Sequence, residues 1–290
     1  MIVTTLEQSM SSEGTISDKH FSIISKLAYD EAGLMITDSK RQMIESRLLR
    51  HMRSIDCEDF DSYLSSIKDD ATGDKRNSLI SVLTTNVSSF FREKHHFDTI
   101  EKSVLPKLRD KAARKRKIRL WSAGCSSGQE PFSLAMLILE KAPDLAKVDI
   151  RILGTDIDHA VLKRAQSGIF KKEEVASLPS DYRTRFIKEM SASSGDCRVS
   201  PEVSELVSFR PLNLIESWPM KGRFDVIFCR NVVIYFDSAT QLKLWPRFHS
   251  ALESNGHLFL GHSERIPAPE NAGFMPDGVT TYIKSPTSKP

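Results

Sequence analysis

The sequence predicts an α/β protein, with a mostly parallel sheet covered by helices on both faces and a smaller all-helical module before it. From residue 118 onward, short apolar runs alternate with amphipathic segments, as strands and helices joined by right-handed crossovers do. The stretch IRLWSAGCSSGQE, residues 118–130, places a glycine-rich turn between the first apolar run and the first helix. Because ligands of such sheets bind at the carboxyl ends of the strands, we expect the functional site beside this turn.

Composition narrows the class of protein. The chain has 290 residues, of which 40% are apolar, enough for one α/β domain and a smaller module. A formal net charge of +3 is too small to indicate a nucleic-acid-binding protein by itself. The cysteines are scattered, without a Cys-x-x-Cys pair or histidines at zinc spacing, so we expect neither a disulfide framework nor a metal site. No signal peptide or apolar run of membrane-spanning length is apparent, which predicts a cytoplasmic protein.

The N-terminal part is predicted to be helical. Residues 1–16 are polar and small and are expected to form a mobile tail before a helical module over residues 17–90. The first helix should begin at Ser17 and end at Gly33, and the second should be capped by Asp38. The predicted ranges of the other helices are 38–55, 60–67 and 74–84. The apolar face of the second helix is predicted to consist of Ile44, Leu48, Met52 and Ile55.

The opposite face of that second helix is basic. It carries Lys40, Arg47, Arg50 and Arg53, which we call the basic stripe. Such a stripe is commonly a solvated helix surface, and it can also dock an acidic partner. Periodicity alone leaves both interpretations open.

Residues 91–117 are predicted to be a hinge and a linker helix. The stretch TTNVSSFFREKHHFDTI, residues 84–100, forms the junction between the helical module and this hinge. In it, an aromatic pair precedes Arg92. Periodicity favours a packed hinge for Phe90 and Phe91, and surface or core positions for His95 and His96. The basic run that follows, residues 104–117, contains no aromatic residue for stacking bases, which favours a solvated linker over a nucleic-acid site.

The main domain is assigned to residues 118–290. Strands are predicted at 118–122, 148–155, 206–210, 224–229, 256–261 and 280–284, and helices at 129–141, 158–167 and 237–252. The alternation stops at about residues 169–205, where a helix over 181–190 and a short hairpin are expected. This insertion is predicted to be a small β-subdomain, and insertions of this kind often contact partners.

The turn and the second strand together predict a nucleoside cofactor without phosphates. Gly124 and Gly128 allow the backbone to approach a ligand, but their spacing is not the G-x-G-x-x-G pattern of dinucleotide binding. Glu130 would repel phosphate and favour a cation or an amine. Asp156 ends the second strand, where a carboxylate can accept bonds from both ribose hydroxyls, while Asp158 is expected to cap the next helix. S-adenosylmethionine fits this pattern, and a nicotinamide remains the alternative.

A further strand, FDVIFC, leads into Arg230 and Asn231. Methyltransferases that act on amides or exocyclic amines place two prolines after an Asn or Asp at this point. No proline follows Asn231. The sequence therefore argues against that class of acceptor.

Several motifs in order resemble one family. These are the stretches GLMITDSKRQMIESRLLRHMR, TTNVSSFFREKHHF, LWSAGCSSGQEPFSLAM, LGTDIDHAVLKRAQSGIF and FDVIFCRNVVIYFD followed by GHLFLGHSE, and the resemblance extends from about residue 17 to 284. Together they resemble the CheR family of chemotaxis receptor glutamate O-methyltransferases. The resemblance implies a class I (Rossmann-like) S-adenosylmethionine methyltransferase domain, with an N-terminal all-helical domain and an inserted β-subdomain.

The resemblance also implies a set of site residues. Those expected to contact S-adenosylmethionine are Asn86, Ser88, Arg92, Glu130, Asp156, Asn213, Leu214, Arg230 and Asn231, with Gly124 supplying close backbone. Ser88 stands where threonine is usual and keeps the hydroxyl. The implied products are a glutamyl methyl ester and S-adenosylhomocysteine. Arg92 and Tyr235 are expected to orient the acceptor carboxylate, although Tyr235 could instead be a packed aromatic at a strand end.

The expected partners follow from the same resemblance. Receptor methylation helices in this family are acidic, so the basic stripe becomes a candidate docking surface. Whether the β-subdomain also binds a peptide at the receptor C-terminus is left open. We expect a monomer that is recruited to membrane receptor arrays, without nucleic-acid partners or membrane insertion. The alternatives are a methyltransferase acting on RNA and a cofactor-binding adaptor without catalysis.

Overall fold

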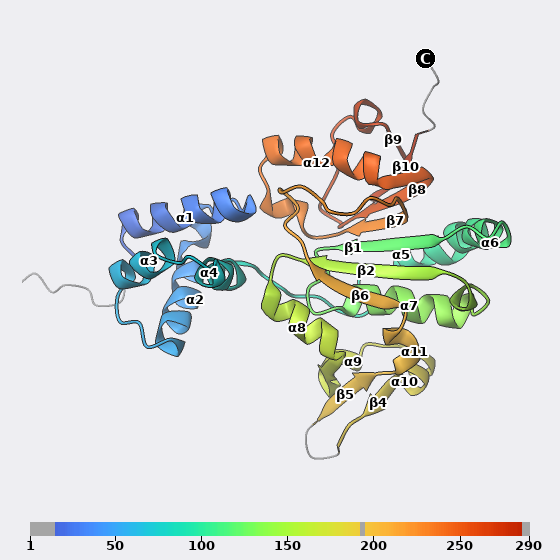
Figure 1. Cartoon of the computed structure of the whole chain (residues 1–290), viewed down its shortest axis with the longest axis horizontal. Helices are drawn as coiled ribbons and strands as arrows, with labels where there is room; N and C mark the ends of the chain where they lie inside the picture. The colour runs from blue at the N-terminus through green and yellow to red at the C-terminus, as the bar shows by residue number, and fades with distance from the viewer. Residues whose placement is uncertain (1–14, 192–194, 286–290) are drawn as a thin grey trace, which may run out of the picture.

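The computed structural model describes residues 15–191 and 195–285. Figure 1 shows the helical module at one end of the molecule, the α/β domain at the other, and the β-subdomain projecting from one side of that domain. The predicted tail falls mainly outside the described residues. It does not extend to Ile16, which is 3% exposed and whose N–H donates to Glu45 Oε1 at 2.7 Å.

The helical module contains α1 (Asp18–Ala32), α2 (Arg41–Ser54), α3 (Phe60–Lys68) and α4 (Asp74–Leu83). Ser17 caps α1, and Gly33 ends it in the left-handed conformation at φ 68°, as predicted. Asp38 is not the cap of α2, because it begins a 3₁₀ turn, Asp38–Lys40, that precedes the helix. The prediction for Ile55 is also wrong: it lies beyond the last turn of α2 and is 49% exposed.

The linker joins the module to the main domain. Its helical segments are α5 (Lys94–Thr99), the π-helical turn η2 (Ile100–Val104) and α6 (Leu105–Ala113). Phe90 is buried, and its ring lies 5.0 Å from that of Phe170. Phe91 packs edge-on against Phe97 at 4.9 Å. The aromatic pair therefore anchors the start of the linker on the main domain.

A seven-stranded sheet forms the centre of the main domain, in the order β6-β2-β1-β7-β8-β10-β9. Its strands are β1 (Ile118–Ala123), β2 (Ile150–Asp156), β6 (Val207–Pro211), β7 (Phe224–Cys229), β8 (Leu252–Leu260), β9 (Phe274–Pro276) and β10 (Thr281–Lys284). The first five in this order pair in parallel, and β10 is antiparallel to both of its neighbours. The strand order reverses between β1 and β7, where a ligand crevice is expected. The predicted fold class is confirmed.

Both faces of the sheet are buried. The helices that cover it include α7 (Gln129–Lys141), α8 (His159–Ser167) and α12 (Ser238–Ala251). Leu120 and Val226 belong to the apolar core shared with α7, whereas their neighbours Trp121 and Ile227 belong to the core shared with α12 and the helical module. This alternation is the two-residue period of a strand covered on both sides.

The β-subdomain is a three-stranded antiparallel sheet in the order β3-β5-β4. It consists of β3 (Ile169–Lys171), α9 (Lys172–Val175), α10 (Ser180–Phe186), β4 (Ile187–Glu189), β5 (Asp196–Val199) and α11 (Pro201–Ser204). The helix predicted at 181–190 ends at Phe186, because Ile187 to Glu189 pair with Cys197 to Val199. Cross-strand pairing thus overrides the helical pattern at its end.

Candidate active site

A cavity lies at the carboxyl ends of β1, β2 and β7, on the side where the helical module approaches. All ten residues predicted to bind cofactor line it, and Tyr235 lines it as well. Ala32, Leu34, Thr84 and Thr85 of the module complete the wall. The structure therefore brings together residues that are far apart in the sequence, at 84–92, 124–130, 156–157, 212–214 and 230–236.

The glycine turn is held close to its neighbours. Gly124 has φ 82°, and a Cβ atom there would lie 2.3 Å from Val232 Cγ2. The N–H groups of Gly124 and Cys125 donate to Thr155 O at 2.8 and 2.9 Å. Any larger residue at position 124 would push the turn away from the loop after β7.

Asp156 ties this turn to the end of β2. Its Oδ2 accepts the N–H of Ser126 at 2.8 Å, and its Oδ1 accepts the N–H of Asp158 at 3.0 Å. Burial raises the pKa of Asp156 to about 6, although the backbone N–H donors oppose that rise. Each carboxylate oxygen accepts one bond from the described residues and retains capacity for a ligand hydroxyl.

Asp158 links the module to the main domain. It caps α8 as predicted, accepting the N–H of Ala160 at 2.8 Å. Its Oδ2 accepts a bond from Asn86 Nδ2 at 2.6 Å. The carbonyl of Asn86 accepts a bond from Ser126 Oγ at 2.8 Å, so the module segment is fixed to the glycine turn.

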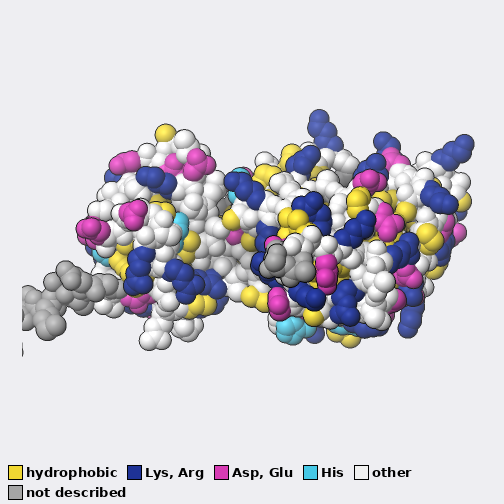
Figure 2. All heavy atoms as spheres, turned by 90° about the horizontal axis from the view of Figure 1, so that it is seen from below, with side chains coloured by type: hydrophobic (Ala, Val, Ile, Leu, Met, Phe, Trp, Pro, Cys, Tyr) yellow, Lys and Arg dark blue, Asp and Glu magenta, His cyan; other side chains and the backbone are white. Residues whose placement is uncertain are grey.

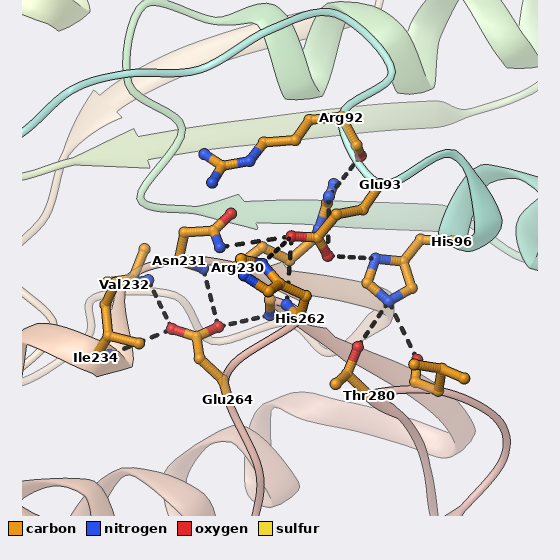
Figure 3. Close-up of polar contacts among 12 residues, drawn as sticks. Arg92, Glu93, His96, Arg230, Asn231, Val232, Ile234, His262, Glu264 and Thr280 are labelled. Atoms are coloured by element: carbon orange, nitrogen blue, oxygen red, sulfur yellow. Dashed lines mark hydrogen bonds and ion pairs between the residues drawn. The ribbon is translucent and has the colours of Figure 1, made fainter.

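A buried ion-pair chain forms another wall of the cavity. The side chain of Arg230 is 1% exposed, and its guanidinium contacts Glu130 Oε2 at 3.0 Å and Glu93 Oε2 at 3.3 Å. Figure 3 shows Glu93 between Arg230, Asn231, His96 and His262. Burial raises the pKa of Glu130, and Arg230 opposes the rise. The expected free negative charge at Glu130 is thus already paired, but two carboxylates around one guanidinium leave an excess of negative charge that still suits a cationic ligand.

Tyr235 lies where the two domains meet. It ends the 3₁₀ turn η4 (Val233–Tyr235), and its carbonyl accepts the N–H of Met35 at 2.8 Å. The ammonium of Lys40 lies 5.4 Å from the centre of its ring. The Tyr235 hydroxyl makes no hydrogen bond to any of the residues that the structure describes. The phenol therefore lines the cavity with an available polar end.

Arg92 and Asn213 have structural contacts besides their place in the cavity wall. The Arg92 guanidinium donates to Val87 O at 3.1 Å, and the Arg92 carbonyl accepts a bond from Arg230. Asn213 Nδ2 donates to Glu31 O, at the end of α1, at 2.7 Å. The carbonyl of Leu214 accepts a bond from Arg247 at 2.7 Å. The Asn213 bond joins the main domain to the end of α1, whereas the Leu214 bond lies within the main domain.

The basic stripe does not line the cavity, and the structure divides it. Arg47 is half-buried, and its guanidinium donates to Thr84 O at 2.7 Å and to Thr85 Oγ1 at 3.1 Å. Arg50 and Arg53 are exposed. Figure 2 shows basic side chains gathered on the underside of the module, the side on which α2 lies. Arg50 and Arg53 are therefore the most accessible members of the stripe, whereas Arg47 binds the segment at 84–85 and Lys40 lies over the ring of Tyr235.

Glu93 and Glu264 are central to the site but received no role from the sequence. Glu93 occurs in FFREKHHF and Glu264 in GHSE, both within the motifs that carry the family resemblance. Neither fits an apolar period or a helix cap that periodicity could predict. Their presence in these motifs was the only signal that the sequence offered.

The neighbouring histidines are explained by packing. His96 is fully buried, and its Nε2 lies 3.0 Å from Thr280 Oγ1, while His95 is exposed. Burial, followed by the charge of Arg230, lowers the pKa of His96 to about 3. Potential ligand atoms of Glu93, His95 and His96 lie within 4.8 Å of one another, but the guanidinium of Arg230 beside Glu93 would repel a metal cation.

Among the helices that the structure describes, none has both the length and the apolar character needed to span a membrane.

Comparison with known proteins identifies the family of the chain. Residues 86–283 match the model of the CheR methyltransferase SAM-binding domain, and residues 19–84 match that of the CheR methyltransferase all-alpha domain. The chain is 40% identical over 288 residues to the chemotaxis protein methyltransferase of Escherichia coli K12, covering 97% of this chain and 96% of that one. It is 39% identical over 257 residues to the probable chemotaxis protein methyltransferase of Rhizobium etli, covering 88% and 96%. The chain belongs to the CheR methyltransferase family.

Proposed function

We propose that this protein transfers the methyl group of S-adenosylmethionine to glutamate side chains of chemoreceptors, for sensory adaptation. The products would be glutamyl methyl esters and S-adenosylhomocysteine. The observation that carries the proposal is the single cavity in which Asp156, the Glu130–Arg230 pair and Tyr235 meet. The relatives' names, chemotaxis protein methyltransferase, support the chemoreceptor substrate.

The residues of the cavity fit the cofactor. Asp156 can accept both ribose hydroxyls, and the excess negative charge near Glu130 and Glu93 suits the sulfonium and ammonium groups. Gly124 lets the turn pack against Val232, where a Cβ atom would clash, and both residues line the cavity. When bound, S-adenosylmethionine supplies an electrophilic methyl group.

The acceptor needs position more than activation. A glutamate with an ordinary pKa of about 4.3 is ionised near neutral pH, so no general base is required. A bond forms between a carboxylate oxygen and the methyl carbon while the carbon–sulfur bond breaks and sulfur keeps the electron pair. Tyr235 and Arg92 would orient the carboxylate, since both line the cavity and the Tyr235 phenol has an available polar end.

Two surfaces could contact the receptor. Arg50 and Arg53 are exposed on α2 and complement acidic receptor helices. The β-subdomain sheet ends at β3 and β4, and an edge strand can accept an added peptide strand. We expect the protein to act as a cytoplasmic monomer recruited to receptor arrays.

Methylation of RNA is the alternative that uses the basic run at 104–117. Part of that run is already paired within the domain: Lys111 contacts Asp225 at 2.5 Å, and Arg109 contacts Asp144 at 2.9 Å. These ion pairs support a linker role for the run over a free nucleic-acid surface.

Incubation with methyl-labelled cofactor and receptor-containing membranes, followed by mild alkali, tests the proposal. Carboxyl methyl esters release volatile methanol, whereas N-methyl groups do not. We expect alkali-labile label in the receptor band. Label in RNA would favour methylation of RNA. Cofactor binding without any methyl transfer would favour a cofactor-binding adaptor without catalysis.

A further inference from the structure

Glu264 lies behind one wall of the cavity, at the loop that follows β8. The residue is 3% exposed and does not line the cavity. Its Oε1 accepts the N–H groups of Val232 at 2.8 Å and Ile234 at 3.2 Å, and its Oε2 accepts those of Asn231 at 2.9 Å and Gly261 at 2.5 Å. Figure 3 shows this carboxylate beneath the loop that carries Asn231. One side chain therefore satisfies four backbone donors from two loops.

The loop over residues 231–235 needs such support. Asn231 has φ 59°, in the left-handed region that non-glycine residues rarely adopt. Three N–H groups of this short loop turn inward, where an unpaired donor would be costly. The loop also supplies Asn231, Val232 and Tyr235 to the cavity. Its conformation thus decides where these side chains stand.

Gly261 is matched to the same arrangement. A Cβ atom at this position would lie 2.5 Å from Asn231 Nδ2 and 2.8 Å from Glu264 Oε2. A side chain would therefore separate the carboxylate from the loop that it binds. The glycine lets the two loops close on each other.

We propose that Glu264 is the positioning residue that sets the conformation of residues 231–235, and through them the placement of Asn231 and Tyr235 in the cavity. Glu264 acts through the loop backbone and touches neither cofactor nor acceptor. The inference deepens the proposed function and rests on it for the identity of the ligand. Burial raises the pKa of Glu264, and the four N–H donors oppose that rise by stabilising the ionised form.

Acceptor capacity distinguishes this role from simple filling of space. A carboxylate is acceptor-only, and each Glu264 oxygen accepts two N–H groups. Glutamine has nearly the same shape, but its amide nitrogen would face two N–H donors with donors of its own. Glu264→Gln can therefore satisfy at most two of the four contacts.

The chain offers a matched control in Asp70 of the helical module. This residue is 8% exposed, and its carboxylate accepts the N–H groups of Thr72, Gly73, Lys75 and Arg76 at 2.7–3.2 Å. Asp70 does not line the cavity. Asp70→Asn removes the same kind of backbone contact without touching the site.

The experiment compares S-adenosylhomocysteine affinity by calorimetry in the wild type, Glu264→Gln, Glu264→Asp and Asp70→Asn proteins. We expect Glu264→Gln to weaken binding by about tenfold or more and to lower turnover further, because small displacements of positioned groups are costly. Asp70→Asn should stay within about twofold of wild type while losing thermal stability. Glu264→Asp keeps an acceptor-only group and should fall between wild type and Glu264→Gln. Hydrogen exchange should accelerate in the peptide covering residues 230–235 of Glu264→Gln.

The outcomes separate this proposal from the substrate assignment. Equal affinities for Glu264→Gln and Asp70→Asn would overturn the positioning role, as would a Glu264→Asp protein that binds no better than Glu264→Gln. If Glu264→Gln does not fold, Glu264→Asp takes its place in the comparison with Asp70→Asn. Equal S-adenosylhomocysteine affinities of these two variants would then overturn the positioning role. A wild-type protein that binds S-adenosylhomocysteine but methylates no receptor would contradict the proposed substrate. The comparison of affinities among the variants would still be valid.

Discussion

The two walls of the cavity are held in different ways. On the α/β side, Asp156 and Arg230 are buried and bonded to groups within the cavity wall. On the module side, the segment at 84–89 is partly exposed, Val87 reaching 77%, and Asn86 is its main polar link to the domain. Polar groups that are buried and mutually bonded keep their geometry, whereas exposed segments adjust. We therefore expect the α/β wall to determine ligand affinity and the module wall to modulate it.

The largest contrast should come from two glycines of similar conformation. Gly124 in the α/β wall and Gly73 in the module have φ 82° and 81°, but a Cβ atom would clash only at Gly124. We expect Gly124→Ala to weaken cofactor binding on the order of a hundredfold, from backbone strain together with overpacking. Gly73→Ala should cost stability alone. Calorimetry with S-adenosylhomocysteine measures both affinities, and equal affinities would show that the close backbone packing at Gly124 is not needed for cofactor binding.

Removal of a polar group from each wall should give the next contrast. Asp156→Ala removes the proposed ribose acceptor and is expected to weaken cofactor binding by roughly thirtyfold, as loss of charged hydrogen bonds does. Asn86→Ala, on the module side, should weaken it by only about threefold, because its side chain acts through Asp158. A larger effect for Asn86→Ala would reverse the proposed order of the two walls.

The pH dependence of cofactor affinity also tests the role of Asp156 in the α/β wall. Folding raises the pKa of Asp156 to about 6, so its protonation favours the folded cofactor-free protein, and this contribution is lost as the pH rises through about 6. Cofactor affinity should change in the opposite direction, because the ionised carboxylate is the better acceptor for ribose hydroxyls. We expect affinity to fall by up to about tenfold for each pH unit below 6. Titrations from pH 5 to 8 with Asp156→Asn as reference, in which this dependence should be absent, provide the measurement.

Tyr235 contacts both domains, and its variant separates turnover from binding. Tyr235→Phe removes only the hydroxyl, which makes no hydrogen bond to any described residue. We expect turnover to fall by about tenfold with cofactor affinity nearly unchanged, because the hydroxyl would orient the acceptor rather than hold the cofactor. Initial rates at saturating cofactor test this. An unchanged rate would leave Tyr235 as a packing residue.

The smallest effect is expected at the surface of the module. Reversal of Arg50 and Arg53 to Glu should raise the apparent Michaelis constant for receptor by about threefold, less at high salt, since exposed charge pairs are weak. Arg47 should be left intact, because its reversal would break the bonds to Thr84 and Thr85. Insensitivity to both charge reversal and salt would identify the exposed pair as an ordinary solvated surface.

Local patterns in the sequence were sufficient for most of the fold and for the composition of the site. The strand alternation, the end of α1 at Gly33 and the Asp158 cap depend on neighbouring residues, and all three occur in the structure. The ten residues predicted to bind cofactor all line one cavity. Where the pattern depended on a remote partner it failed: Ile187 to Glu189 became a strand by pairing with β5, and Arg47 turned inward to the segment after α4.

The sequence by itself determined the elements, the fold class and the residue types of the site, because periodicity, caps and turn glycines act over a few positions. Only the tertiary structure decided how the charges are paired. It placed Glu130 and Glu93, 37 residues apart by number, on one guanidinium, and Glu264 under a loop some thirty positions earlier. Buried polar groups take whichever partners the fold brings within reach, and that proximity is a property of the packed chain.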